Sequence, residues 1–195
     1  MADDRTGRVR HALDPSPVRV HFFDSLTRQK VGMISQVTDI QVRRAKPDDA
    51  EALVRLRGLM LAAMGNDLGG PDAPWREIAR QWFAEQLASP ETFAAYVVDD
   101  PAAGVVAGAA GNVHVHPPGP NDLTTVRGHL YNVSTEPDFR RRGLARACVV
   151  ALMDWFRDET AVGQVELHAT DDGVELYRAL GFTESRYPTL RFRRS

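Results

Sequence analysis

Apolar and polar residues alternate with two distinct periods along the chain from about residue 40 onward. A two-residue period is typical of a strand with one buried face, and a period of three to four residues is typical of an amphipathic helix. Strand-like runs cover residues 40–44, 92–100, 104–116, 129–135, 163–170 and 185–194. Helix-like runs cover residues 47–61, 75–89, 144–159 and 173–180. The order β-α-α-β-β-β-α-β-α-β predicts a mixed α/β domain with a largely antiparallel first half and a strand-helix-strand crossover in the second.

The clearest helix signal covers residues 144–159. Its apolar residues recur at helical spacing and form a wide stripe: Leu144, Ala147, Cys148, Ala151, Leu152, Trp155 and Phe156. The stripe predicts that one face of this helix is buried, with Cys148 as a small apolar core residue. For the short helix over 173–180, we expect Asp171 or Asp172 at the N-cap and Gly181 just after the C-terminus.

Residues 1–38 differ from the rest of the chain. They mix charges and turn formers with two prolines and show no sustained period, apart from a short strand-like run at residues 18–23. Two interpretations remain open, a disordered leader and an arm packed on the domain. The folded domain is expected over residues 39–195.

Composition narrows the classes of function. The formal net charge is −2, so no basic excess favours nucleic acid, and we expect no nucleic-acid partner. Cys148 is the only cysteine, which excludes an intrachain disulfide and a cysteine-based zinc cluster and fits a reducing compartment. No apolar run reaches the roughly 18 residues of a membrane span. We therefore expect a cytoplasmic protein without membrane contact.

A basic, glycine-containing segment, "RRRGLARA" (residues 140–147), joins a predicted strand to the long helix. The first turn of a helix leaves backbone N–H groups unpaired, and the helix dipole adds positive charge there. Gly143 lets a bulky anion approach the backbone, and the arginines add charge. These features predict a phosphate or pyrophosphate site. A solvated basic helix start would contain the same residue types, so residue type alone leaves both interpretations open.

The spacing of this segment resembles a family signature. Arg140-x-x-Gly143-x-Ala145 matches the Gln/Arg-x-x-Gly-x-Gly/Ala pattern of the GNAT acyltransferase superfamily, and "VELYRALGF" (174–182) resembles that family's second hallmark. The resemblance covers roughly residues 40–192. It implies a GNAT-like, mostly antiparallel central sheet flanked by helices. It also implies acetyl-CoA as cosubstrate and direct transfer of an acetyl group to a primary amine of a small-molecule or peptide acceptor.

The same resemblance implies roles for individual residues. The strand end would pair with the pantetheine arm, the loop and helix start would hold the pyrophosphate, and Tyr177 would protonate the leaving thiolate. Thr170 stands where many relatives carry an asparagine. The implied cofactor-binding residues are Val133, Ser134, Thr135, Arg140, Arg141, Arg142, Gly143, Leu144, Ala145, Arg146, Thr170 and Tyr177. Without the motif, Tyr177 would be interpreted as a core aromatic residue on one face of its helix.

The group that deprotonates the amine is not identified by the sequence. The candidates on or near the central strands are His114, His116, His129 and Glu136. Water-relayed deprotonation is an equal alternative. Strand parity groups His129 with Tyr131, Val133 and Thr135, but does not say which face borders the substrate. His168 is expected to be structural, and the His114/His116 pair lacks a third ligand, so we expect no metal site.

Substrate recognition is expected from the loops 64–75 and 114–123, together with Trp75 and Trp82. The loop carboxylates that could attract a cationic amine are Asp67, Asp72 and Asp122, although acidic loop residues are usually only solvated. Two other functions are alternatives to the acetyltransferase. They are a non-catalytic CoA-binding sensor on the same fold and a nucleic-acid-binding protein, which the charge balance disfavours. Homodimers are common in the family, so a homodimer is the expected assembly.

Overall fold

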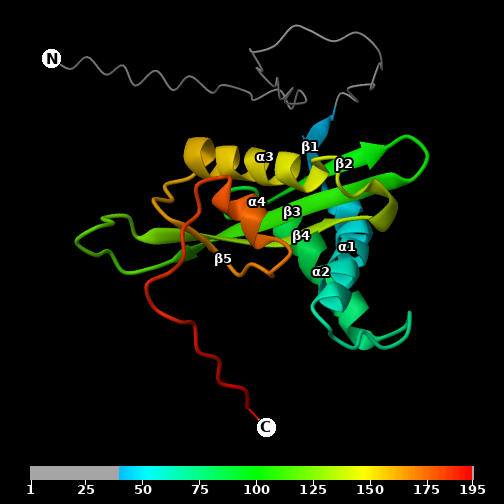
Figure 1. Cartoon of the computed structure of the whole chain (residues 1–195), viewed down its shortest axis with the longest axis horizontal. Helices are drawn as coiled ribbons and strands as arrows, with labels where there is room; N and C mark the ends of the chain where they lie inside the picture. Colours follow the sequence, from blue (N-terminus) through cyan, green and yellow to red (C-terminus); the bar gives the residue numbers. More distant parts are fainter. Residues whose placement is uncertain (1–39, 195) are drawn as a thin grey trace, which may run out of the picture.

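The computed structural model describes residues 40–194, and the elements follow the predicted order up to the last strand (Figure 1). The strands are β1 (Val42–Arg44), β2 (Phe93–Asp100), β3 (Gly104–Val115), β4 (Val126–Thr135) and β5 (Val165–Leu167). The helices are η1 (Pro47–Asp49), α1 (Ala50–Ala63), α2 (Pro74–Leu87), η2 (Pro137–Phe139), α3 (Leu144–Glu159) and α4 (Val174–Arg178). The strands form one sheet in the order β1-β2-β3-β4-β5, antiparallel except for the β4–β5 pair. The predicted mixed α/β class is confirmed.

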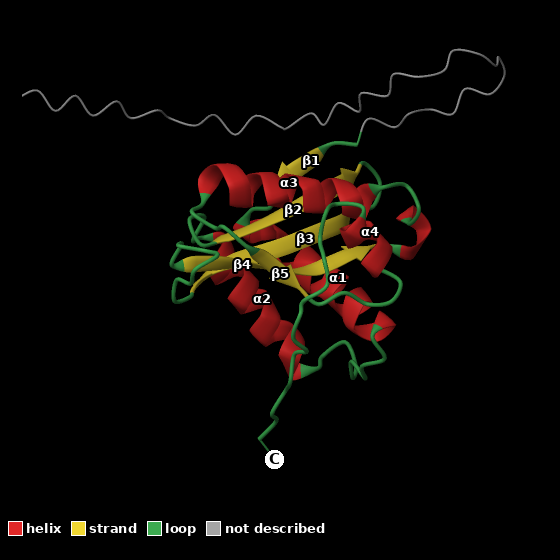
Figure 2. Cartoon of the chain, turned by 60° about the vertical axis from the view of Figure 1, so that its left-hand side comes forward, coloured by secondary structure: helices red, strands yellow, loops and turns green. Residues whose placement is uncertain are grey.

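Helices cover both faces of the sheet (Figure 2). One apolar cluster contains α3 and Tyr177 of α4, together with residues from β1 to β4. The other contains α1 and Phe83 of α2, packed on the opposite face of β2 and β3. All seven residues of the predicted stripe are buried, which confirms the orientation of α3. No helix in the described part of the chain is long and apolar enough to cross a membrane.

Two glycines let α3 pack closely on the sheet. A Cβ added to Gly128 of β4 would lie 2.7 Å from the Phe156 ring, and one added to Gly111 of β3 would lie 2.8 Å from the same ring. Carbon atoms in contact normally lie about 3.5–4.0 Å apart. The Phe156 side chain therefore occupies the space that any larger residue at either position would need.

An irregularity in β4 changes the course of that strand. Ala110 pairs with Tyr131 and Gly108 with Ser134, so β4 contains one residue more than β3 over the same stretch, which is a β-bulge. Asn132 lies in it with a φ of 55°. β4 pairs with β5 only from Gly128 to Leu130. Beyond Leu130, the described residues provide no strand next to β4 on its β5 side.

The structure differs from the sequence predictions at the C-terminal end. Residues 185–194 form no strand, so the predicted closing strand is wrong. Pro188 has no N–H to donate to a sheet, and Leu190 and Phe192 are 89% and 91% exposed, so this segment has no buried face. Gly173, not Asp171 or Asp172, is the N-cap of α4, whereas Gly181 follows the helix with a φ of 90° as predicted. The predictions for residues 1–38 lie outside the described residues.

Candidate active site

The loop that carries the arginines leaves the start of α3 open. Gly143 is the N-cap of α3 with a φ of 79°, a left-handed conformation that favours glycine. A Cβ added there would meet nothing within 4 Å, and residues 140–143 are exposed. The first intrahelical hydrogen bond runs from Ala147 N to Gly143 O, so the earlier amides of the turn have no acceptor one turn back. The opening turn therefore has room for an anion, and its amides are suited to bind one.

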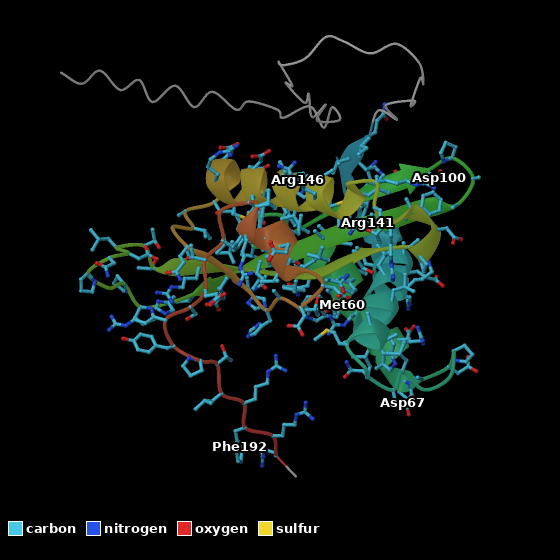
Figure 3. The ribbon with its side chains drawn as sticks, in the orientation of Figure 1. Met60, Asp67, Asp100, Arg141, Arg146 and Phe192 are labelled. Atoms are coloured by element: carbon cyan, nitrogen blue, oxygen red, sulfur yellow. The ribbon has the colours of Figure 1, made fainter. Side chains whose placement is uncertain are left out.

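Two of the arginines hold this loop in place. Arg140 Nε donates to Thr135 O at the end of β4 at 3.3 Å. Arg142 donates to Asp138 O at 2.9 Å, and its guanidinium lies 5.0 Å from the centre of the Phe139 ring. Arg141 is exposed and has a φ of 62°, and Figure 3 shows it near the first turn of α3 together with Arg146. The loop is thus braced from within while Arg141 faces solvent.

The C-terminal part of β4, with Val133, Ser134 and Thr135, leads directly into this loop. Val133 packs in the cluster on the α3 face. Two buried side-chain oxygens here, Asn132 Oδ1 and Thr135 Oγ1, have no hydrogen-bond partner in the described protein. Buried polar atoms of this kind are normally satisfied, so the segment has unused capacity to bind a polar ligand.

Because of the bulge, the prediction that His129, Tyr131 and Val133 share one face of the strand is wrong. His129 and Tyr131 lie on the face toward α1 and α2, but Val133 packs on the α3 face, so it does not share their face. The extra residue at Asn132 reverses the alternation. Asn132 itself is 1% exposed, and its Nδ2 donates to Leu53 O of α1 at 3.4 Å.

Thr170 and Tyr177 lie close together across Gly173. A Cβ added to Gly173 would lie 3.3 Å from Thr170 Oγ1 and 3.4 Å from the Tyr177 ring. Tyr177 is 9% exposed, and its ring packs edge-on against Phe182 with centroids 5.9 Å apart. Burial raises the pKa of Tyr177, so its hydroxyl keeps its proton at neutral pH. Tyr177 is therefore a core residue that also carries a protonated hydroxyl.

A cavity of about 710 Å³ lies between helices α1 and α2 and the central strands. It is lined by Arg57, Leu61, Trp75, Ile78, Ala79, Trp82, Phe83, Asn112, His129 and Tyr131. Of these residues, Trp75, Trp82 and His129 were among the sequence candidates, and Arg57 and Asn112 were not. Arg57 occupies the buried stripe of α1 between Leu53 and Leu61, and this was the available signal that it points inward.

The predicted acidic residues do not line this cavity. Asp67 lies in the loop after α1, where its side chain accepts a bond from Gly69 N at 3.0 Å (Figure 3). Asp122 accepts bonds from the backbone N and the hydroxyl of Thr124, and these bonds lower the pKa of Asp122. These two carboxylates shape loops, and Asp72 is also absent from the lining.

Of the four candidate bases, only His129 borders the cavity. Burial lowers the pKa of His129, opposed by Glu166, whose carboxylate lies 3.8 Å from its Nδ1. Its imidazole is therefore neutral at pH 7 and can accept a proton. Glu136 is ion-paired with Arg55, and His116 Nδ1 lies 2.6 Å from Pro117 O.

Sequence and structure comparisons agree on one family. The Acetyltransferase (GNAT) family profile matches residues 61–182, more than half of the chain. No curated protein matches the chain. A GCN5-related N-acetyltransferase from Ralstonia eutropha is 25% identical, with a TM-score of 0.68 over 78% of this chain and 98% of that one.

Two further solved structures share the fold at lower identity. A predicted acetyltransferase with acetyl-CoA from Clostridium acetobutylicum is 22% identical, with a TM-score of 0.67 over 78% of this chain and 96% of that one. Glucosamine-6-phosphate N-acetyltransferase from Arabidopsis thaliana is 16% identical, with a TM-score of 0.61 over 78% and 97%. Together with the profile match, the sheet and the open helix start lead to one assignment. The chain belongs to the acetyltransferase (GNAT) family.

Proposed function

We propose that this protein is an acetyl-CoA-dependent N-acetyltransferase that transfers the acetyl group directly to a primary amine of a small-molecule or peptide acceptor. The observation that carries the proposal is the separation of β4 from β5 after Leu130, beside the open start of α3. A separated strand offers backbone groups to an extended ligand, and a helix start offers amides to its phosphates.

The residues present fit such a cosubstrate. The backbone of Val133–Thr135 lies where the strands have separated, and Thr135 Oγ1 is buried with no hydrogen-bond partner among the residues that the structure describes. The amides of Arg141–Ala145 would hold the pyrophosphate, with the side chains of Arg141, Arg142 and Arg146 adding positive charge around it. Leu144 is buried, so only its amide would take part. Thr170 and Tyr177 would lie at the thioester end.

Acetyl-CoA supplies an activated acetyl group and a thiolate leaving group. The chain must therefore polarise a carbonyl, donate one proton and accept another. A backbone N–H of Val133–Thr135 would donate to the carbonyl oxygen. The Tyr177 hydroxyl, which burial keeps protonated, would donate to the thiolate. His129, neutral at pH 7, would accept the proton from the amine directly or through a water molecule.

Calorimetry with acetyl-CoA, followed by a thiol-release assay with a panel of amines, tests the proposal. The expected result is micromolar binding and amine-dependent thiol release. Absence of binding to the folded protein would overturn the proposal. Binding without turnover for any amine would favour the alternative, a non-catalytic acetyl-CoA or CoA sensor, in which Tyr177→Phe changes nothing measurable.

Assembly and location belong to the same proposal. Homodimers are common in this family, and we propose one here. Light scattering on the purified protein would give twice the monomer mass of 21.6 kDa. The cytoplasmic location, proposed from the single cysteine, is tested by fractionation of the native cells.

A further inference from the structure

The α2 side of the cavity between α1, α2 and the central strands is apolar and aromatic. Trp75, Ile78 and Trp82 of α2 form one side, and Trp82 packs against Phe93 and Tyr131 with ring centroids 5.7 and 6.4 Å apart. Trp82 and Ile78 still remain exposed in part. A cavity with aromatic and aliphatic walls binds the apolar body of a small molecule and gains from removing its surface from water.

Arg57 is the only lining residue with a permanent charge, and no carboxylate lines the cavity. Its guanidinium forms no ion pair with any described carboxylate. Arg55, two residues earlier in α1, is ion-paired with Glu136 and also donates a hydrogen bond to Val105 O. Arg57 is half-buried, and its charge acts on the hydroxyl of Tyr131. A half-buried guanidinium with no ion-pair partner in the described part of the chain is suited to bind a carboxylate in bidentate geometry.

The other polar groups of the cavity lie on the strands. His129 and Asn112 face it from β4 and β3, and the His129 ring lies 5.5 Å from the Tyr131 ring. Tyr131 is therefore close to both the positive charge of Arg57 and the imidazole of His129. An acceptor with its amine toward His129 would place a second polar group near Arg57. A polycation would instead bring positive charge against Arg57 with no carboxylate in the lining to balance it.

We infer that the acceptor is a small amine that also carries a carboxylate and an apolar or aromatic side chain, the chemistry of an apolar α-amino acid, with Arg57 binding the carboxylate. This inference rests on the proposed acetyltransferase function and narrows its substrate class. It excludes polyamines and polycationic amino sugars as preferred acceptors.

Thiol release with three matched amines tests this inference. L-phenylalanine carries the predicted carboxylate, phenethylamine has the same body without it, and spermidine is a polycation. The kcat/KM for L-phenylalanine is expected to exceed that for phenethylamine by at least about tenfold, because Arg57 would form a charge-assisted hydrogen bond with its carboxylate; a tenfold ratio corresponds to about 1.4 kcal/mol. Arg57→Gln is expected to bring the ratio close to one without changing acetyl-CoA affinity. Arg80→Gln, on the exposed face of α2, is the control and should keep the ratio.

The failure of this inference can be distinguished from failure of the proposed function. Equal or better turnover of phenethylamine or spermidine would overturn the acceptor class while retaining the enzyme. If acetyl-CoA binds but no amine is acetylated, quenching of Trp75 and Trp82 fluorescence by L-phenylalanine decides the matter. If L-phenylalanine quenches the fluorescence of the unaltered protein but not that of Arg57→Gln, the proposed binding site is supported. If it quenches neither protein, the proposed binding site is wrong.

Discussion

Gly128→Ala is expected to destabilise the protein through the contact between α3 and the sheet. The added Cβ would lie 2.7–3.0 Å from three atoms of the Phe156 ring. That ring is 2% exposed and packs against Trp155 at a centroid distance of 4.7 Å, so it has no free space to enter. Overpacking a core by one methyl group typically costs about 1–3 kcal/mol. For a chain of this size, that cost corresponds to a fall in Tm of roughly 2–12 °C.

Urea unfolding followed by circular dichroism measures this cost. Gly70→Ala is the matched control, because a Cβ there meets nothing within 4 Å, and its effect should stay within about 0.5 kcal/mol. Adding Phe156→Leu to Gly128→Ala should recover part of the loss, since it removes the atoms that clash, and residues in contact couple by about 0.5–3 kcal/mol. An unfolding midpoint for Gly128→Ala equal to that of the unaltered protein would refute the close approach of α3.

Three further predictions concern the site. Gly143→Glu forces a side chain into a left-handed conformation and adds negative charge beside the helix start, so acetyl-CoA affinity measured by calorimetry should fall at least about tenfold. Tyr177→Phe keeps the ring and removes the hydroxyl, so it should lower kcat by about 100-fold and leave acetyl-CoA affinity unchanged; an unchanged kcat would mean that Tyr177 serves only packing. Burial holds the pKa of His129 below its ordinary value, and only the neutral imidazole accepts a proton, so kcat should rise with pH at a midpoint below pH 6.5. His129→Gln should remove this rise, and a rise that persists in the variant would exclude His129 as the base.

The features that the sequence predicted depend on neighbouring residues along the chain. The α3 stripe and the arginine loop each lie within a continuous segment whose period or spacing is visible directly, and their predicted positions are confirmed. Gly181 after α4 is another local signal, because its left-handed conformation ends the helix.

The features that the sequence missed depend on contacts between distant segments. A two-residue period gives no sign of the extra residue at Asn132, so the reversal of faces before Val133 was invisible. Arg57 becomes part of a cavity only when α1 packs against β4. Two of the carboxylates proposed for substrate recognition, Asp67 and Asp122, instead accept hydrogen bonds within their own loops. The closing strand was predicted from alternation alone, but Pro188 and exposed apolar residues give residues 185–194 no face to bury.

The two apolar clusters on opposite faces of the sheet have a consequence for how such a protein can diversify. The proposed acceptor cavity is built from α1, α2 and the strand face beneath them, while the proposed pyrophosphate loop opens α3 on the other side. In this arrangement, substitutions on α2 would change the specificity for the acceptor without changing the binding of acetyl-CoA. The Asn132 side chain reaches Leu53 of α1 and its backbone lies in the β-bulge, so Asn132 connects the two sides, and we expect it to tolerate few replacements.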